Sequence, residues 1–256
     1  MILPSYHLIV ETPHYLVVSK DHLLPTVPLK RDVNSDSLLK QVSHQYPEVL
    51  NGFHEGLVLH RLDTATRGLV LIARSKEVYD YFQEEQRLGR FIKTYHAQST
   101  YIDILPPGYP PHNFTLETSI SFNISSLFRP FWEGRKEVRP VTDDTNSYLK
   151  KRGTPHFYVS SVTYVRKNED DYFNFVVTLQ RGFRHQVRSH LCWSHYPIIG
   201  DSLYGGKQAS HLHLIASNIQ FYDYTSRELR EYSLFEDGVD PFEESLYKEN
   251  KRYEFK

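Results

Sequence analysis

The sequence predicts an α+β fold for this chain of 256 residues. Segments with the two-residue alternation of strands are mixed with segments of helical periodicity, and no regular strand-helix-strand repeat orders them. Hydrophobic residues make up 39% of the chain, which is enough to build a sizeable core. We expect one domain over residues 1–256, in which about residues 222–256 form an acidic C-terminal extension.

The N-terminal region predicts a hairpin followed by a helix. β-rich runs at residues 6–11 and 14–20 are separated by Thr12 and Pro13, as in a strand pair. Residues 37–46 show helical spacing, with Asp36 or Ser37 as N-cap and Pro47 near the end. The apolar face of this helix would consist of Leu38, Leu39, Val42 and Tyr46.

The next region predicts a polar loop held at both ends. Apolar runs at residues 56–60 and 68–73 flank this loop, and residues 75–85 predict a helix capped by its first serine. Residues 91–97 alternate as a strand does. The proline-rich residues 105–111 should break regular structure and begin a long connection or insertion.

The C-terminal half predicts a second strand pair and a further helix. Residues 157–165 and 172–180 alternate around a charged turn and read as paired strands. Residues 185–193 can form a helix, and residues 211–216 suggest another apolar element. These elements, with those before them, account for a mixed α+β arrangement.

Composition limits the classes of protein and partner. The formal net charge is −1, but residues 223–256 hold 6 basic against 10 acidic residues, so the rest of the chain carries +3. The single cysteine, Cys192, excludes an intrachain disulfide framework. No signal sequence and no apolar stretch of about 18 residues is found, so we expect a soluble, cytoplasmic protein without a membrane span.

One polar loop carries the strongest chemical signal. Residues 60–68 place a single acid, Asp63, among cations, with hydroxyl side chains and a glycine beside it. A neighbouring cation favours the ionised carboxylate, which could then act as a nucleophile or base. The same aspartate could instead have a structural role, accepting hydrogen bonds from loop amides.

Three ordered motifs resemble those of the RsuA/RluA class of pseudouridine synthases, and most closely its RluA-type members. His60-Arg-Leu-Asp63 with Thr66, Gly68, Leu71 and Ala73 is similar to the catalytic motif HRLDxxTSGxxLxA. Lys93-Thr-Tyr95-His-Ala97 is similar to KxYxA. His185-Gln-Val-Arg188 with His190, followed by residues 197–205, is similar to HQ[IL]RxH and PIxGDxxYG. The resemblance extends over about residues 7–221.

The resemblance implies an enzyme that isomerises uridine to pseudouridine in ribosomal or transfer RNA, without a cofactor. It implies a mixed, mostly antiparallel sheet flanked by helices, a central active-site cleft and a monomer. We expect no separate N-terminal RNA-binding module of the kind that the family has, so RNA recognition would depend on the catalytic body or added loops. The uridine is expected to flip out of its stack to reach the catalytic groups. By matching position, Asp63 is the nucleophile, Tyr95 the active-site tyrosine, and Arg188 the arginine that pairs with the aspartate. The expected substrate-binding residues are Arg61, Thr66, Lys93, Arg184, His185 and Gln186.

Several positions depart from the family pattern. Arg181 and Phe183 replace a threonine and an arginine before the HQ[IL]R motif, and Arg67 replaces a serine in the catalytic motif. The usual proline after Lys20 is absent. These changes leave the aspartate intact but alter the surroundings of the substrate. A noncatalytic RNA-binding descendant of the fold is therefore the main alternative.

Three other features of the sequence could indicate a different function or a further contact. His211 and His213 could share a strand face as metal ligands, but the sequence offers no convincing third ligand. Cys192 lies near His190 and His195, yet no oxyanion-binding motif accompanies it, so a thiol nucleophile is disfavoured. Residues 128–139, which include Trp132 and several cations, fit an RNA contact or a packed surface insertion equally well.

Overall fold

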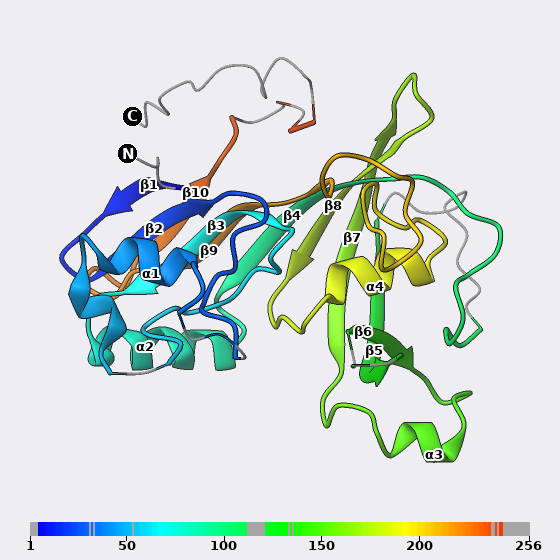
Figure 1. Ribbon diagram of the computed structural model, residues 1–256, viewed down its shortest axis with the longest axis horizontal. Coiled ribbons are helices and arrows are strands. Elements are labelled where there is room, and N and C mark those ends of the chain that lie inside the picture. The colour runs from blue at the N-terminus through cyan, green and yellow to red at the C-terminus, as the bar shows by residue number, and fades with distance from the viewer. Residues whose placement is uncertain are drawn as a thin grey trace. The chain divides into compact units, whose positions relative to one another are not determined.

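A computed structural model gives the fold of the chain (Figure 1). It describes residues 5–30, 32, 34–52, 54–111, 121–132, 134, 136–236, 239, 241 and 242. The chain divides into two compact units, and each has its own set of strands. The first unit comprises Met1–Lys93 and Ile215–Lys256, and the second comprises Thr94–Leu214.

The first unit is built on a mixed sheet. Its strands lie in the order β1 (Tyr6–Glu11), β2 (Tyr15–Lys20), β3 (Arg67–Ala73) and β9 (Leu214–Tyr222), and β10 (Leu229–Ser233) also pairs with β9. The β1–β2, β2–β3 and β9–β10 pairs are antiparallel, whereas β3 and β9 are parallel. Every residue of β3 after Arg67 is buried, so this strand lies in the middle of the core.

Helices pack against this sheet and are capped as the sequence predicts. Ser37 caps α1 (Leu38–Ser43) by accepting the Lys40 amide, and Ser75 caps α2 (Lys76–Arg87) by accepting the Val78 amide. A short 3₁₀ turn, η1 (Pro47–Leu50), follows α1. The α2 side chains Val78 and Phe82 join the apolar core formed by β2, β3 and β9.

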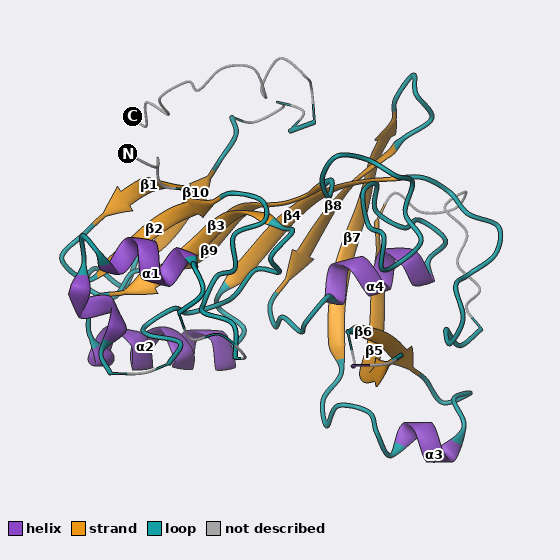
Figure 2. Ribbon diagram, in the orientation of Figure 1, coloured by secondary structure: helices purple, strands orange, loops and turns teal. Residues whose placement is uncertain are grey.

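The second unit has its own run of strands (Figure 2). They lie in the order β4 (Ile92–Ser99), β8 (Phe173–Leu179), β7 (Tyr158–Lys167), β5 (Ser121–Phe131) and β6 (Glu137–Val141). The β5–β6, β5–β7 and β7–β8 pairs are antiparallel. The helices of this unit are α3 (Ser147–Lys150) and α4 (Gln186–Trp193), and all eight residues of α4 are buried.

A buried polar centre fixes α4 against the strands. The His190 ring is fully buried and lies between two serines, with Nε2 2.9 Å from Ser126 Oγ and Nδ1 2.8 Å from Ser160 Oγ. It also stacks on Phe128, with ring centroids 4.8 Å apart. Because both ring nitrogens have hydroxyl partners, this buried histidine has a structural role.

The predicted α+β class is confirmed, and most of the predicted elements are present. The N-terminal hairpin, the pair formed by β7 and β8, and the helix at residues 185–193 are confirmed. Residues 105–111 contain no helix or strand. The apolar run at residues 56–60 forms only an isolated bridge between Val58 and Ile72, and the element predicted at residues 211–216 continues as β9 to Tyr222.

Some elements of the structure were not predicted, and some of the segments considered in the sequence lie outside the described residues. The strands β5, β6 and β10 and the short helix α3 were missed. The acidic tail beyond residue 242, residues 112–120, and Glu133 and Arg135 of the 128–139 segment lie outside the described residues. Within the part of the chain that is described, no helix is long and apolar enough to cross a membrane.

Candidate active site

Asp63 lies in a turn between Leu62 and β3. Its carbonyl oxygen accepts a hydrogen bond from the Thr66 amide at 2.9 Å, which closes the turn. The last residue of β2 and the segment that follows it also hold the backbone of this turn. Lys20 Nζ donates to the Thr64 carbonyl at 3.3 Å, and His22 Nδ1 donates to the Ala65 carbonyl at 3.0 Å. These contacts fix the path of the chain around the aspartate.

Thr26 completes the attachment of the loop. Its hydroxyl donates to the Leu62 carbonyl at 2.9 Å and accepts from the Leu62 amide at 3.1 Å. Thr26 is buried, as is Leu62. The residue just before Asp63 is therefore bound through both of its backbone polar groups.

Gly68 fixes the other end of the loop. It opens β3 beside β9, and a Cβ atom at this position would lie 2.2 Å from the Ala216 carbonyl oxygen. Its φ of +127° is one that side chains disfavour. Only glycine therefore allows β3 to approach β9 this closely directly after the turn.

Lys20 is a buried cation close enough to Asp63 for the two charges to interact. Its side chain is fully buried, and its ammonium donates to the Asp21 and Leu24 carbonyls at 2.9 and 2.7 Å. Burial lowers the pKa of Lys20 to about 8, while the nearby Asp63 carboxylate opposes this change. The sequence analysis assigns no role to this lysine, because strand alternation does not reveal a buried ammonium.

Arg61 and Thr66 differ in exposure. The Arg61 guanidinium is exposed and forms an ion pair with Glu55. An exposed cation of this kind is available to a phosphate at small cost, since a surface ion pair contributes little stability. Thr66 is only 2% exposed, and its hydroxyl has no hydrogen-bond partner among the described residues.

Lys93 lies in an apolar setting beside His60. It is 4% exposed, and its Nζ lies 5.2 Å from the centre of the Phe91 ring. The His60 ring lies 5.3 Å from the same ring and accepts the Leu71 amide on Nε2. Burial lowers the pKa of Lys93 to about 8. Burial, with the charge of Lys93, lowers the pKa of His60 to about 3, so this histidine is neutral near pH 7.

Replacing Lys93 with methionine is expected to stabilise the protein near pH 7. The described residues provide no ion pair for the Lys93 ammonium, so the folded state bears the cost of a buried charge. We expect a gain of about 3 kcal/mol in the free energy of unfolding at pH 7. Urea unfolding of both proteins between pH 6 and pH 10, read by circular dichroism, checks this.

The pH dependence of this gain has a defined sign. Folding lowers the pKa of Lys93 from 10.5 to about 8, so the wild type bears the full cost below pH 8. Above that pH the folded lysine loses its proton, and the advantage of Lys93→Met should disappear as the pH approaches 10.5. Lys76→Met, at an exposed position of α2, is the control. A gain that did not change with pH would contradict a charge-based cost.

Arg188 forms a buried, two-point ion pair in the second unit. Its Nε lies 2.7 Å from Asp201 Oδ2 and its Nη2 lies 2.7 Å from Asp201 Oδ1, and the side chains are 7% and 0% exposed. The Arg188 guanidinium also lies 5.2 Å from the centre of the Tyr204 ring. This geometry holds the guanidinium in one orientation, as the fork of arginine allows and a lysine would not.

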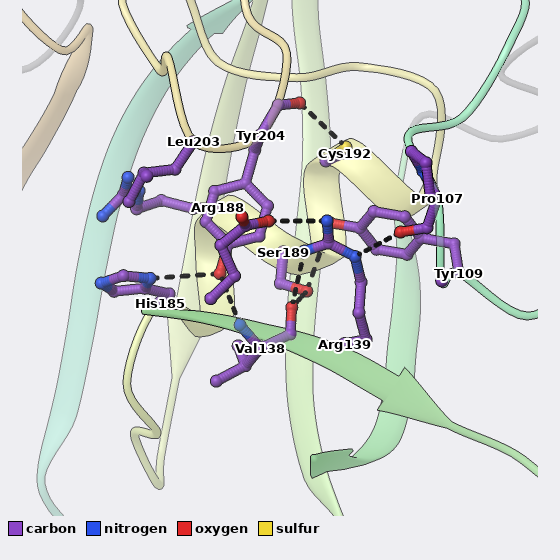
Figure 3. Close-up of polar contacts among 12 residues, drawn as sticks. Pro107, Tyr109, Val138, Arg139, His185, Arg188, Ser189, Cys192, Leu203 and Tyr204 are labelled. Carbon is purple, nitrogen blue, oxygen red and sulfur yellow. Dashed lines mark hydrogen bonds and ion pairs between the residues drawn. The ribbon is translucent and has the colours of Figure 1, made fainter. Parts of the chain in front are cut away.

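Tyr204 links this pair to its surroundings (Figure 3). Its hydroxyl accepts the Val138 amide at 3.0 Å and lies 3.1 Å from His185 Nδ1. Burial is the main cause that raises the pKa of Tyr204, so the phenol stays protonated near neutral pH. His185 is thus placed by a buried phenol and by its own left-handed backbone at the start of α4, with φ 55°.

The remaining predicted residues of this unit have distinct surroundings. Gln186 is 2% exposed, and its side chain accepts the Phe183 amide and donates to the Val159 carbonyl and to Ser160 Oγ. These bonds hold the Gln186 side chain in one orientation. Arg184 donates to the Glu137 carbonyl at 3.3 Å. Tyr95, on β4, is 8% exposed.

Asp201 and Tyr204 contact Arg188 but are not among the residues that the sequence analysis assigns to the site. Both stand in the motif at residues 197–205, which was matched as a pattern without assigning a contact. The sequence signal that could have identified them is an acid and a tyrosine at a fixed spacing along the chain after Arg188. The substitution at Phe183 has a structural reason, because its ring stacks on Phe128 with centroids 5.1 Å apart.

The other candidate chemistries gain little from the structure. No group of three or more histidine, cysteine, aspartate or glutamate side chains able to hold a metal ion occurs in the described part of the chain. His211 and His213 stack on each other, with ring centroids 4.9 Å apart. Burial raises the pKa of the Cys192 thiol to about 12, so this thiol is protonated and a poor nucleophile near neutral pH.

Comparison with known proteins decides the family. The family model for RNA pseudouridylate synthase matches residues 13–193, more than half of the chain. The chain belongs to the RNA pseudouridylate synthase family. This match includes Asp63, Tyr95 and Arg188 within its bounds. The resemblance to RluA-type members is confirmed.

Relatives of this family differ in how much of their length is matched. An RNA pseudouridine synthase from Chloroflexus aurantiacus is 29% identical over 181 residues, 70% of this chain and 48% of the relative. The chain thus spans about half the length of that protein. A dual-specificity RNA pseudouridine synthase RluA from Vibrio parahaemolyticus is 25% identical over 89% of this chain and 82% of its own length.

A solved structure supports the same fold. Human RNA pseudouridylate synthase domain containing 1 superposes with a TM-score of 0.66 and 20% sequence identity, covering 96% of this chain and 89% of that chain. At this identity the similarity shows the pseudouridine synthase fold and no more.

Proposed function

We propose that the protein is an RNA pseudouridine synthase that isomerises specific uridines in ribosomal or transfer RNA. Membership of the family supports this reaction, and relatives named for ribosomal and for transfer RNA support the two substrate classes. The observation that carries the proposal is the setting of Asp63. It lies in a turn bound by Lys20, His22 and Thr26. The ammonium of Lys20 is fully buried and close enough to interact electrostatically with the Asp63 carboxylate.

The reaction needs only groups that the chain can supply. The N1–C1′ bond breaks, the uracil turns, and a C5–C1′ bond forms, while the proton lost from C5 is balanced by one gained at N1. No oxidant, reductant or co-reactant enters this balance, so no cofactor is required. Asp63 attacks C1′ or assists the departure of uracil, and the uridine must flip out of its stack to be reached.

The other proposed site residues take supporting roles. Tyr95 and Arg188 are the remaining catalytic residues by the family motifs, and Tyr95 offers a flat ring for stacking the detached base. The proposed substrate-binding residues are Arg61, Thr66, Lys93, Arg184, His185 and Gln186. We further propose that residues 1–256 act as one catalytic domain, as a monomer and in the cytoplasm.

Pseudouridine mapping tests the proposed function. Cellular RNA would be mapped with and without the gene, and after restoration of either the wild type or Asp63→Ala. Sites that vanish without the gene and return only with the wild type would support the synthase and identify its RNA. If no site in any RNA class depends on the gene, and the purified wild type fails on the same RNA, the protein is instead a noncatalytic RNA-binding relative.

A further inference from the structure

The hairpin formed by β5 and β6, together with α3, carries a surplus of positive charge. Residues 128–152 contain seven lysines and arginines against four acidic residues, a net charge of +3 in a chain whose total is −1. This segment lies outside the motifs that define the catalytic residues. A local positive surplus of this kind attracts polyanions.

Arg129 is a buried cation in this hairpin, and no ion pair joins it to a carboxylate among the described residues. It is 7% exposed, its Nη2 donates to the Gly108 carbonyl at 2.9 Å, and no acceptor for its Nε occurs among the described residues. Its cross-strand neighbour Arg139 is also buried, but Arg139 has Glu137 as an ion-pair partner at 2.6 Å. Burial and the charges of Arg139 and Arg152 lower the pKa of Arg129.

The positive charge near Arg129 is therefore only partly neutralised. Arg139 and Arg152 act on Arg129 electrostatically, and both have the same sign as Arg129. Glu137 is already engaged by Arg139. Among the described residues, a phosphate that formed charge-assisted hydrogen bonds with the exposed Arg152 would bring further negative charge close to this cluster.

Trp132 places an exposed aromatic ring beside this cluster. Its side chain is 66% exposed, and its backbone is left-handed, with φ +64°. Such a conformation is disfavoured for a bulky residue. The Trp132 ring lies 5.7 Å from the Phe131 ring, which in turn lies 5.1 Å from the Arg129 guanidinium. A stacking surface and a cation thus occupy neighbouring positions at the end of β5.

The segment after α3 is tied to the same strand. The Thr154 amide donates to the Phe128 carbonyl at 2.8 Å, and the Phe128 amide donates to Thr154 Oγ1 at 3.0 Å. These bonds hold the exposed Arg152 near β5. The Arg152 guanidinium lies 5.9 Å from the Tyr148 ring, whose side chain is 67% exposed. Arg152 is therefore accessible to a ligand that also reaches the hairpin.

We propose that the hairpin β5–β6 binds a single-stranded segment of RNA, with the exposed Arg152 on a phosphate, the charge of the buried Arg129 adding to the attraction, and the Trp132 ring stacked on a base. Guanidinium groups that form no ion pair with a carboxylate among the described residues, together with an exposed tryptophan, match two recurring features of single-strand recognition, cations for the backbone and a stacking platform for the bases. An acidic peptide would use the cations but would leave the tryptophan without a base to stack on. The choice of RNA rests on the proposed function.

Binding of a short fluorescein-labelled oligouridylate, followed by anisotropy over a range of salt concentrations, tests this surface. Trp132→Ala is expected to raise the Kd about 5- to 100-fold, the range for loss of one stacked base. Trp132→Phe, which keeps a ring, should lose much less. Arg152→Gln is expected to weaken binding and to reduce the slope of log Kd against log salt by about 0.7, the value for one phosphate contact on a single strand.

Tryptophan fluorescence gives an independent signal. The chain has two tryptophans, and Trp193 is 3% exposed, with its Nε1 donating to the Pro110 carbonyl. Oligouridylate should therefore quench the fluorescence of the wild type and leave that of Trp132→Phe nearly unchanged. Quenching that is the same in both proteins would overturn the stacking role.

Exposed residues elsewhere provide the controls. Tyr101→Ala removes a ring that is 53% exposed, and Arg230→Gln removes a cation on β10 that is 47% exposed. Both variants should bind oligouridylate as the wild type does. The proposal is overturned if Trp132→Ala and Arg152→Gln keep the wild-type Kd and salt slope, or if polyglutamate competes as well as RNA of equal charge.

Failure of this surface and failure of the synthase assignment give different results. If Asp63→Ala keeps wild-type binding and quenching but the wild type converts no uridine, the binding surface stands and the synthase does not. If the wild type converts uridine while Trp132→Ala and Arg152→Gln bind and turn over RNA normally, the synthase stands and this surface does not.

Discussion

Asp63→Asn is expected to lower the rate of pseudouridine formation by at least about a thousandfold, the scale seen when a nucleophile is removed. Asparagine has nearly the shape of aspartate, so the turn closed between the Asp63 carbonyl and the Thr66 amide should persist. The amide, however, has no negative charge with which to attack C1′ or to stabilise a developing positive charge. Single-turnover assays with purified protein and substrate RNA measure this loss.

The loss should appear in turnover and not in binding. Because Lys20, His22 and Thr26 hold the turn through its backbone, removing the carboxylate charge should leave the loop in place. The Kd for substrate RNA should therefore stay close to that of the wild type. Asp80→Asn, at an exposed position of α2, is the matched control and should keep full activity. Wild-type turnover by Asp63→Asn would exclude Asp63 as the nucleophile.

The loop that carries Asp63 could be recognised from sequence as a candidate site because its residue types differ from those of its surroundings. Asp63 is the single acid in a loop rich in cations and hydroxyls, between two apolar runs. Lys20 could not be recognised in this way. Its ammonium is buried only because the chain after β2 folds back and offers the Asp21 and Leu24 carbonyls, an arrangement set by tertiary structure.

The missed hairpin has a different cause. Pro130 in β5 and Pro140 in β6 argue against strands, because proline cannot donate to a ladder. The structure accommodates both prolines. Pro130 lies beyond the part of β5 that pairs with β7, and β6 is the last strand in its sheet order. A strand signal based on alternation and on the absence of proline therefore fails where proline lies at a sheet edge.

Asp201→Asn is expected to destabilise the protein by about 3 to 5 kcal/mol, the cost of breaking a buried ion pair by removing one charge. Both oxygens of Asp201 accept hydrogen bonds from Arg188 at 2.7 Å, and neither side chain is more than 7% exposed. The amide can accept at only one atom and carries no charge to balance the guanidinium. Urea unfolding at pH 7 measures the change.

Two further variants distinguish the effect of losing a charge from the effect of losing packing. Glu228→Gln, whose partner Arg230 is 3.1 Å away and 47% exposed, should cost less than about 1 kcal/mol. Arg188→Met combined with Asp201→Leu should recover much of the stability lost in Asp201→Asn, because apolar side chains of similar volume can replace a buried pair. This double variant should still fail to form pseudouridine, since it lacks the proposed catalytic Arg188. If the double variant were stable and active, Arg188 would have a role in the fold and none in catalysis. If Asp201→Asn lost less than about 1 kcal/mol, the ion pair would not be needed for stability either.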